Sequence, residues 1–488
     1  MKSKLFTAIT VSLVISGTVM AEETIPLNAV NKANEVIDRA IEAYGGADTL
    51  NGITAVHRKQ KFKTWATYQS KKPGPPWDEA ETLNWAAVNF ETEQFRGYNA
   101  GSGGGFDFEG GQLINGDGSY NFDFRGGTMT EIANPDFHTT AGPFIRVTAP
   151  LLIKQLQERR NTSHWLGEAE VKGTVHDIVT LVMEVGPALA LYIDQDSGML
   201  TRSERVLPPF GQVDYRFSDY ETIDGIPFAK HFELYVNDQP NLLSERWDTQ
   251  VNPDFAQFVA LPAGLDVVPA VAAPTDVELQ EIEEGVFLVG ANGTYVMFVE
   301  MDDHVISVGG TAGVDQRIAA LREVVADKPI TYGVLTHHHN DHLLGVPVYE
   351  AEDATIVTVA QHEEVVRNTA ADGDGLKLQL VDGKYVFNGG SRTVEVHDIG
   401  PTPHTEHLLV AYMPDEGILF EADHFPNPLT GRFPPAQPVT KRLAAAIDEL
   451  GLEVRMIIGA HSPRVATRED LNRVLATKPV NVAATASW

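Results

Sequence analysis

Apolar and polar positions alternate over most of residues 27–260, in short segments that turn residues separate. One segment differs, because Val36, Ile37 and Ile41 within residues 29–44 recur at helical spacing before a Gly-Gly pair. A second helix is predicted at 150–160. Gly-Gly, Asn-Gly-Asp-Gly and Asp-Ser-Gly breaks indicate hairpins between predicted strands. These strands cover residues 55–62, 82–95, 112–124, 178–185, 190–193, 200–206 and 212–220. We therefore expect a mostly antiparallel β (α+β) N-terminal domain over residues 22–260.

The pattern changes after a Pro- and Ala-rich stretch, residues 261–275, which lacks periodicity and predicts a semi-extended linker. From 276 to 488, predicted strands alternate with amphipathic helices, which is typical of an α/β domain. Strands are predicted at 285–289, 295–299, 304–308, 330–335, 355–359, 393–397, 408–413, 418–420 and 455–458, and helices at 315–326, 361–369 and 443–450. Thr467 and Asp470 have the spacing that caps a last helix.

Composition bounds the classes of function. The chain has 488 residues, with 43% hydrophobic and 21% charged positions, which suits two or three globular domains. Its formal charge of -30 makes nucleic acid and anionic membrane surfaces poor partners. The absence of cysteine from the sequence excludes disulfides, thiolate ligands and a cysteine nucleophile. Nothing in the pattern predicts an oligomeric state.

The first 21 residues have the pattern of a signal peptide. Lys2 and Lys4 precede an apolar run, and Val19 and Ala21 occupy the small-residue positions before Glu22. A membrane anchor helix is the alternative, but the run is short and Thr, Ser and Gly interrupt it. We expect cleavage after Ala21, no stable membrane anchor, and an exported protein, most simply in a bacterial periplasm.

A histidine cluster directly follows the predicted strand at 330–335. His337, His339, Asp341 and His342 form a His-x-His-x-Asp-His pattern. Neutral imidazole and carboxylate are ligands that bind zinc and similar divalent metals. A strand end followed by a first helical turn could present two of these groups to one ion and two to a neighbouring ion.

Residues 276–488 resemble the metallo-β-lactamase superfamily, whose fold is an αββα sandwich of two sheets between helices. The Thr-His-x-His-x-Asp-His block matches, and three later positions follow in the family's order: His404 ten residues before Pro414, Asp423 in Leu-Phe-Glu-Ala-Asp-His, and His461 in Ile-Ile-Gly-Ala-His-Ser. The resemblance implies one metal at His337, His339 and His404, a second at Asp341, His342 and His461, and Asp423 contacting both.

Such a ligand set implies hydrolytic chemistry. Three imidazoles leave zinc an open position for water, whose pKa falls to about 7 on the metal, and a second ion roughly 3.5–4 Å away shares it. Asp341 would then orient or deprotonate this water as the catalytic carboxylate. The expected cofactors are two divalent metal ions, with Zn²⁺ the first choice and iron or manganese as alternatives.

Other residues near these motifs have more ordinary interpretations. A lone His404 or His461 would usually be a core or surface histidine, and it is the complete cluster that favours metal binding. His338 should point away from its neighbours, onto the surface or a pocket rim. His407 is either the first residue of a strand or a group near His404. Thr405 could hydrogen-bond a ligand, and His424 is expected to be structural.

The N-terminal domain offers weaker signals. The Gly-rich stretch 101–105 lacks the Gly-Lys-Ser/Thr of a phosphate loop and predicts a flexible hairpin loop over a ligand face. Residues 191–202 and 219–228 resemble exported lipoprotein-carrier domains. That resemblance implies a curved antiparallel sheet around a helix, with an apolar concave face. Such a domain would bind an apolar molecule or shape the entrance to the catalytic half.

The substrate is expected to be a small molecule. Asp423 differs from the cysteine or serine of many zinc β-lactamases, and Pro426 stands where several carry a substrate-binding lysine. This favours hydrolysis of an ester, lactone, thioester or amide, with a β-lactamase as the alternative. An iron-dependent oxidoreductase resembling sulfur dioxygenases is a second class, and a binding protein with an inert second half is a third. Arg432, Lys441 and Arg442 are either anion-binding or solvated.

Overall fold

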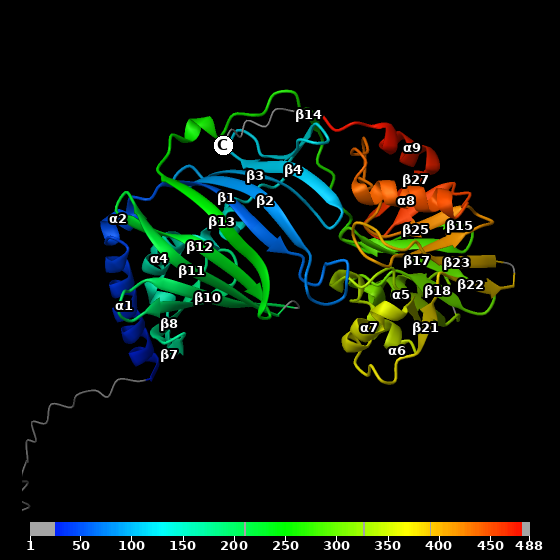
Figure 1. Ribbon diagram of the computed structural model, residues 1–488, viewed down its shortest axis with the longest axis horizontal. Coiled ribbons are helices and arrows are strands. Elements are labelled where there is room, and N and C mark those ends of the chain that lie inside the picture. Colours follow the sequence, from blue (N-terminus) through cyan, green and yellow to red (C-terminus); the bar gives the residue numbers. More distant parts are fainter. Residues whose placement is uncertain (1–24, 209–210, 326, 391, 481–488) are drawn as a thin grey trace, which may run out of the picture.

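The computed structural model describes residues 25–208, 211–325, 327–390 and 392–480 (Figure 1). The predicted signal peptide, residues 1–21, lies outside the described residues. Among the helices that are described, none has the length and apolar character needed to cross a membrane.

Fourteen strands of the described chain form one continuous sheet, which Figure 1 shows as strongly curved. Its order is β14-β6-β5-β4-β3-β2-β1-β13-β12-β11-β10-β9-β8-β7. Only the edge pair β14 and β6 is parallel among these described strands. The strands are β1 Ala55–Trp65, β2 Glu79–Asn89, β3 Gln94–Gly103, β4 Phe106–Ile114, β5 Tyr120–Asp123, β6 Thr128–Glu131, β7 Trp165–Val171, β8 Thr174–Val182, β9 Ala188–Asp194, β10 Leu200–Leu207, β11 Gly211–Ile223, β12 Ile226–Val236, β13 Gln239–Val251 and β14 Asp266–Val268.

Four helices accompany this sheet: α1 Ile25–Ala43, α2 Ala47–Asn51, α3 Phe137–Arg146 and α4 Ala149–Glu158. Ile37 of α1 and Leu152 of α4 share a buried core with Leu191 and Phe232 of the sheet. The predicted helices at 29–44 and 150–160 correspond to α1 and α4. Helix α3 was not predicted, because it is short and carries Pro143; the Asp136 side chain caps its first turn by accepting from the Thr139 amide.

The second half of the chain contains two further sheets, which pack face to face through a buried cluster that includes Met297, Val334, Val396 and Phe420. The first sheet runs β15-β16-β17-β18-β19-β20-β21 and the second β22-β23-β24-β25-β26-β27. The strands are β15 Glu278–Glu283, β16 Val286–Ala291, β17 Thr294–Glu300, β18 Val305–Val308, β19 Ile330–Val334, β20 Thr355–Val359, β21 Leu378–Val381, β22 Lys384–Gly389, β23 Arg392–Asp398, β24 Leu409–Met413, β25 Ile418–Glu421, β26 Met456–Gly459 and β27 Ser462–Thr467.

Helices cover the outer faces of both sheets. Helices α5 Val314–Arg322, α6 Val346–Ala351 and α7 Glu363–Thr369 pack on the first sheet, and α8 Pro438–Glu449 and α9 Arg468–Ala476 on the second. Thr467 and Asp470 form the predicted capping box of α9. A mixed α/β chain with many strands is therefore confirmed.

Two connections of the large sheet reach the second half of the chain (Figure 1). Residues 66–78 connect β1 to β2, and we call them the 66–78 loop; within it the Lys71 carbonyl accepts from the Glu406 amide at 3.0 Å. The hairpin between β3 and β4 bonds to Gln437, whose side chain accepts from the Asp107 amide at 3.0 Å and donates to its carbonyl at 3.1 Å. Both connections end beside the histidine cluster.

Candidate metal centre

Strand ends from two sheets deliver the seven predicted ligands to one place. The buried parallel strand β19 leads into His337 and His339, and the short turn Asn340–His342 follows. His404 lies between β23 and β24, Asp423 directly after β25, and His461 between β26 and β27. Asp423 has a φ of 61°, a left-handed conformation that Asp tolerates better than most residues. Ligand positions at the ends of β-strands therefore converge between the two sheets.

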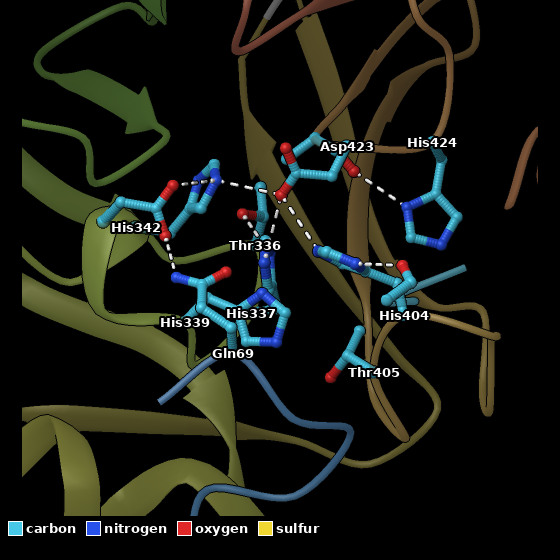
Figure 2. Close-up of polar contacts among 12 residues, drawn as sticks. Gln69, Thr336, His337, His339, His342, His404, Thr405, Asp423 and His424 are labelled. Atoms are coloured by element: carbon cyan, nitrogen blue, oxygen red, sulfur yellow. Dashed lines mark hydrogen bonds and ion pairs between the residues drawn. The ribbon is translucent and has the colours of Figure 1, made fainter. Parts of the chain in front are cut away.

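Asp423 lies at the centre of this cluster, and Figure 2 shows His337, His342 and His404 directed toward it. Its Oδ2 lies 3.2 Å from His337 Nε2, 3.0 Å from His342 Nε2 and 3.3 Å from His404 Nε2. Its Oδ1 lies 2.8 Å from His461 Nε2. One carboxylate thus contacts imidazoles from both of the metal sites that the sequence predicted.

The potential ligand atoms fall into two groups, each with its atoms within 4.8 Å of one another. The first group is His337, His339, His404 and Asp423, and the second is Asp341, His342 and His461. The structure thereby brings all seven predicted site residues together, with Asp423 in the first group. Because Asp423 Oδ1 also reaches His461, it lies between the groups.

The donor atoms fit a metal ion. His337 Nε2, His339 Nδ1 and His404 Nε2 are buried and lack a hydrogen-bond partner among the residues that the structure describes. Asp423 Oδ2 is near two of these nitrogens, but without the alignment of a hydrogen bond. Buried polar atoms without a partner are costly, and a cation at their focus would satisfy all three. Imidazole and carboxylate are also the donors that zinc prefers.

Electrostatics keeps His337, His339 and Asp423 in the protonation states that bind metals, whereas it favours the protonated ring of His461, whose proton a bound ion would have to displace. Burial lowers the pKa of His337 and of His339 well below the usual value, so both rings are neutral. Burial alone would raise the pKa of Asp423, but His342 and the other imidazoles hold it well below its ordinary value. Burial likewise lowers the pKa of His461, yet the Asp423 carboxylate outweighs it and raises that pKa to about 9.

Main-chain carbonyls of the large sheet orient two of the three histidines in the first group. His339 Nε2 donates to the Ser70 carbonyl at 3.0 Å, and His404 Nδ1 donates to the Gly104 carbonyl at 2.6 Å. A ring nitrogen that donates to a carbonyl leaves the other nitrogen free to bind metal. These contacts therefore leave Nδ1 of His339 and Nε2 of His404 to bind an ion, and the latter lies 3.3 Å from Asp423 Oδ2.

Gln69 provides a third contact from the same side of the molecule, and Figure 2 shows it beside the cluster. Its Nε2 donates to Asp341 Oδ1 at 2.8 Å and to Asn340 Oδ1 at 2.6 Å. Sequence reasoning missed Gln69, Ser70 and Gly104. For Gly104 a partial signal existed, since the Gly-rich stretch was expected to lie over a ligand face.

The neighbouring residues behave differently from some predictions. His338 is 3% exposed, so the expectation that it lies on the surface is wrong; its Nε2 donates to the Ser70 carbonyl at 2.9 Å because the 66–78 loop covers it. Thr405 contacts His338 and the His407 carbonyl rather than one of the seven predicted ligands. His407 precedes β24 and pairs with Asp398 at 2.7 Å. His424 is buried beside the His404 ring, and its ring bonds the Ala422 carbonyl.

A cavity of about 230 Å³ opens on Asp423 and His461. Its described lining holds no lysine or arginine: Phe106, Glu421, Asp423, Phe425, Pro426, Asn427, Gly459, His461 and Ser462. Arg432 donates to the Gly126 carbonyl, and Arg442 to the Ile399 and Pro401 carbonyls and to Glu449. These two arginines therefore serve structural contacts.

A second cavity of about 460 Å³ lies between the large sheet and the histidine cluster. It is mostly apolar, with Leu207 and Val236 on one side, Leu343 and Val365 on the other, and His338 in its wall. His338 thus meets the expectation of lining a pocket.

The family model described as the Metallo-beta-lactamase superfamily matches residues 267–461, so this part of the chain is a domain of that superfamily. No curated protein matches the chain. The resemblance of the first half to lipoprotein carriers stays a prediction.

Solved structures that resemble the chain include a metallo-beta-lactamase from Pontibacter korlensis, at 18% identity over 41% of this chain and 97% of that one, with a TM-score of 0.34. The metallo-beta-lactamase FIM-1 from Pseudomonas aeruginosa, in its mono-zinc form, is 21% identical over 41% and 95%, with a TM-score of 0.32. A metallo-beta-lactamase from Hirschia baltica is 19% identical over 41% and 95%, with a TM-score of 0.31.

Proposed function

We propose that the protein is an exported hydrolase that holds two divalent metal ions and cleaves a small ester, lactone, thioester or amide. The superfamily domain over residues 267–461 supports the metal-dependent hydrolase class. The two packed sheets with helices on their outer faces support the αββα assignment. The predicted signal peptide supports export, which protein sequencing would test by finding Glu22 as the mature N-terminus.

One observation carries the proposal: seven ligand residues, Asp423 among them, converge in two groups, and three of the buried nitrogens lack a partner among the described residues. We assign His337, His339 and His404 to the first ion and Asp341, His342 and His461 to the second, with Asp423 between them. Zn²⁺ is the ion that best matches these donors. Bound divalent ions would supply Lewis-acid chemistry and a nucleophilic water at neutral pH.

The chain's own groups orient the reactants. We assign to Asp341 the role of orienting the attacking water, because its side chain is 47% exposed to solvent while Gln69 holds one of its oxygens. Phe106 packs edge-on against His404, with ring centroids 5.7 Å apart, and lines the cavity at Asp423. Phe106 would therefore exclude water from one side of a bound substrate.

The cavity chemistry favours an uncharged reacting group. A carboxylate-bearing substrate needs a cation, and the described lining of the cavity at Asp423 contains neither lysine nor arginine, with Pro426 at the family's lysine position. This disfavours a β-lactamase, which stays the alternative within hydrolases. The larger apolar cavity supports a substrate with an apolar part.

A hydrolysis screen tests the proposal. Purified protein is assayed on aryl esters, acyl-homoserine lactones, thioesters, nitrocefin and phosphodiesters, with and without a chelator. We expect turnover of an uncharged ester, lactone or thioester that the chelator abolishes and added Zn²⁺ restores. The His337→Ala variant should lose this turnover, and the His164→Ala variant, changed at an exposed residue, should retain it. Turnover that is insensitive to chelator on every substrate would contradict the proposed mechanism.

Metal analysis distinguishes the proposed hydrolase from the two other functional classes, an oxidoreductase and a binding protein. Abundant iron together with oxygen consumption would replace the hydrolase by an oxidoreductase. Hydrolysis that persists when His337→Ala has lost its bound metal would instead point to a binding protein with an inert metal centre.

A further inference from the structure

The 66–78 loop presents one turn of backbone and one amide side chain to the metal centre. The turn at residues 66–70 is closed by two hydrogen bonds to the Ala66 carbonyl, one from the backbone N–H of Gln69 and one from the Ser70 hydroxyl, both at 2.9 Å. The Ser70 hydroxyl also accepts from the Asp78 amide at 2.7 Å. Gln69 therefore projects from a turn that hydrogen bonds within the loop hold closed.

Side-chain packing fixes this turn further. Tyr68 has a φ of 63°, an unfavourable conformation for an aromatic residue, and its ring packs on Trp77 with centroids 5.1 Å apart. Trp77 is 8% exposed and donates to Gln239 of β13 at 3.0 Å. Residues held in sparsely populated conformations persist only when their surroundings enforce them. Here β13 and the rest of the large sheet hold the turn in place.

Gln69 is the strongest polar partner that the structure gives to the Asp341 side chain. One Gln69 nitrogen donates to Asp341 Oδ1 at 2.8 Å and to Asn340 Oδ1 at 2.6 Å, which uses both protons of the amide. Among the residues that the structure describes, the carboxylate's other contact within 4 Å is His342 Nε2, 3.6 Å from Oδ2. Because Asp341 is half exposed, packing alone does not select its rotamer. The side-chain amide of Gln69 selects the rotamer that leaves Oδ2 facing His342.

We propose that Gln69 is a positioning residue for the second metal-binding group, so that the large N-terminal sheet completes the metal centre of the other half of the chain. This inference rests on the proposed metal centre and deepens it. Gln69 acts through Asp341, by holding one carboxylate oxygen so that the other can bind the ion beside His342 and His461. The Ser70 and Gly104 carbonyls serve the first group in the same manner, but side-chain substitution cannot remove them.

The expected effect follows from general experience with groups that hydrogen-bond metal ligands. Removing such a group lowers metal affinity by about 10–100-fold. The loss should fall on the second ion alone, because Gln69 contacts Asp341, whereas His337, His339 and His404 keep their own hydrogen bonds.

The test is a stepwise Co²⁺ titration of the full chain against a chelating indicator, with the visible d–d spectrum recorded at each step. Gln69→Leu removes the donor, and Gln69→Glu keeps the shape but places a carboxylate oxygen against Asp341. Gln437→Leu is the matched control, since this glutamine also joins the two halves but bonds Asp107. Circular dichroism checks that each variant is folded.

We expect the second-step dissociation constant to rise by about 10–100-fold in both Gln69 variants, with a changed second-step spectrum, while Gln437→Leu behaves as wild type. A second step that is unchanged in a folded Gln69→Leu or Gln69→Glu would overturn the inference and leave the hydrolase proposal standing. Equal losses in Gln437→Leu would also overturn it, since docking in general would then be responsible. A wild-type chain that binds no Co²⁺ would refute the proposed metal centre itself.

Discussion

Gly105 allows the β3–β4 hairpin to approach the metal-binding half of the chain, and Gly105→Ala should open that contact. Its φ is +85°, and an added Cβ would lie 2.4 Å from Val439 Cγ1 and 3.0 Å from Pro403 Cβ. Gly104→Ala is the matched control. Gly104 also has a positive φ, +58°, but the nearest atom to its Cβ would be His404 Nδ1 at an ordinary 3.6 Å.

The structure gives the expected difference between Gly105→Ala and Gly104→Ala in the free energy of opening the hairpin. Both substitutions place alanine in the left-handed region at a cost of about 1–2 kcal/mol, which largely cancels in the comparison. Only Gly105→Ala adds a steric overlap, for which overpacking typically costs about 1–3 kcal/mol. Because each 1.4 kcal/mol changes an equilibrium constant about tenfold, the hairpin should be open roughly 5–150 times more often in Gly105→Ala than in Gly104→Ala.

Amide hydrogen exchange measures this opening directly, since exchange of a locally protected amide follows the opening equilibrium. The amides to observe are those of Asp107, bonded to Gln437, and of Val439, 3.3 Å from the Gly105 carbonyl. Their protection should fall by that factor in Gly105→Ala, whereas amides in the core of β12 should not change. Equal protection of both amides in the two variants would refute the steric argument.

Three further outcomes are expected. Chelation should lower the thermal unfolding midpoint of the wild-type chain, because an ion at 100 times its dissociation constant stabilises the native state by about 2.7 kcal/mol; an unchanged midpoint would speak against a bound metal. Burial raises the pKa of Asp177, but bonds from Arg39 at 2.6 Å and Trp165 at 2.9 Å outweigh it, so that pKa is lowered. Its carboxylate therefore adds stability above the unfolded pKa of about 3.9, which is lost as the pH falls through the lower folded pKa. The difference in urea unfolding between wild type and Asp177→Asn should be largest at neutral pH and shrink below about pH 4; a difference independent of pH would contradict this. Leu152→Ala should cost about 2–5 kcal/mol in urea unfolding, with Leu166→Ala, at a residue 58% exposed, nearly neutral; equal effects would contradict the assigned core.

Local sequence patterns were sufficient to predict several elements of the metal-binding half of the chain. The run before His337 predicted a strand at 330–335, and β19 covers Ile330–Val334. The capping pattern at Thr467 predicted the start of α9. These features depend on neighbours within a few residues, which is why the sequence alone suffices.

Long-range pairing could not be inferred in this way. The fourteen-stranded sheet depends on β1 lying between β2 and β13, where Val56 pairs with Val251, and no local signal specifies that neighbour. His338 was expected on the surface or at a pocket rim because alternation turns it away from its neighbours; the 66–78 loop buries it, and it lines the wall of the larger cavity. The roles of the Ser70 and Gly104 carbonyls could not be predicted from the sequence, because every residue has a carbonyl and only the fold decides which ones face a histidine.

The two carbonyls that orient the histidines have a consequence for the order of assembly. Ser70 precedes His339 by 269 residues, and Gly104 precedes His404 by 300. Contacts so distant along the chain form late in folding, because the intervening loop must close first. The acceptors are made early in synthesis and their partners late, so the histidines acquire fixed ring orientations only once the last sheet is in place. We therefore expect metal uptake to be among the final steps by which a new chain becomes mature.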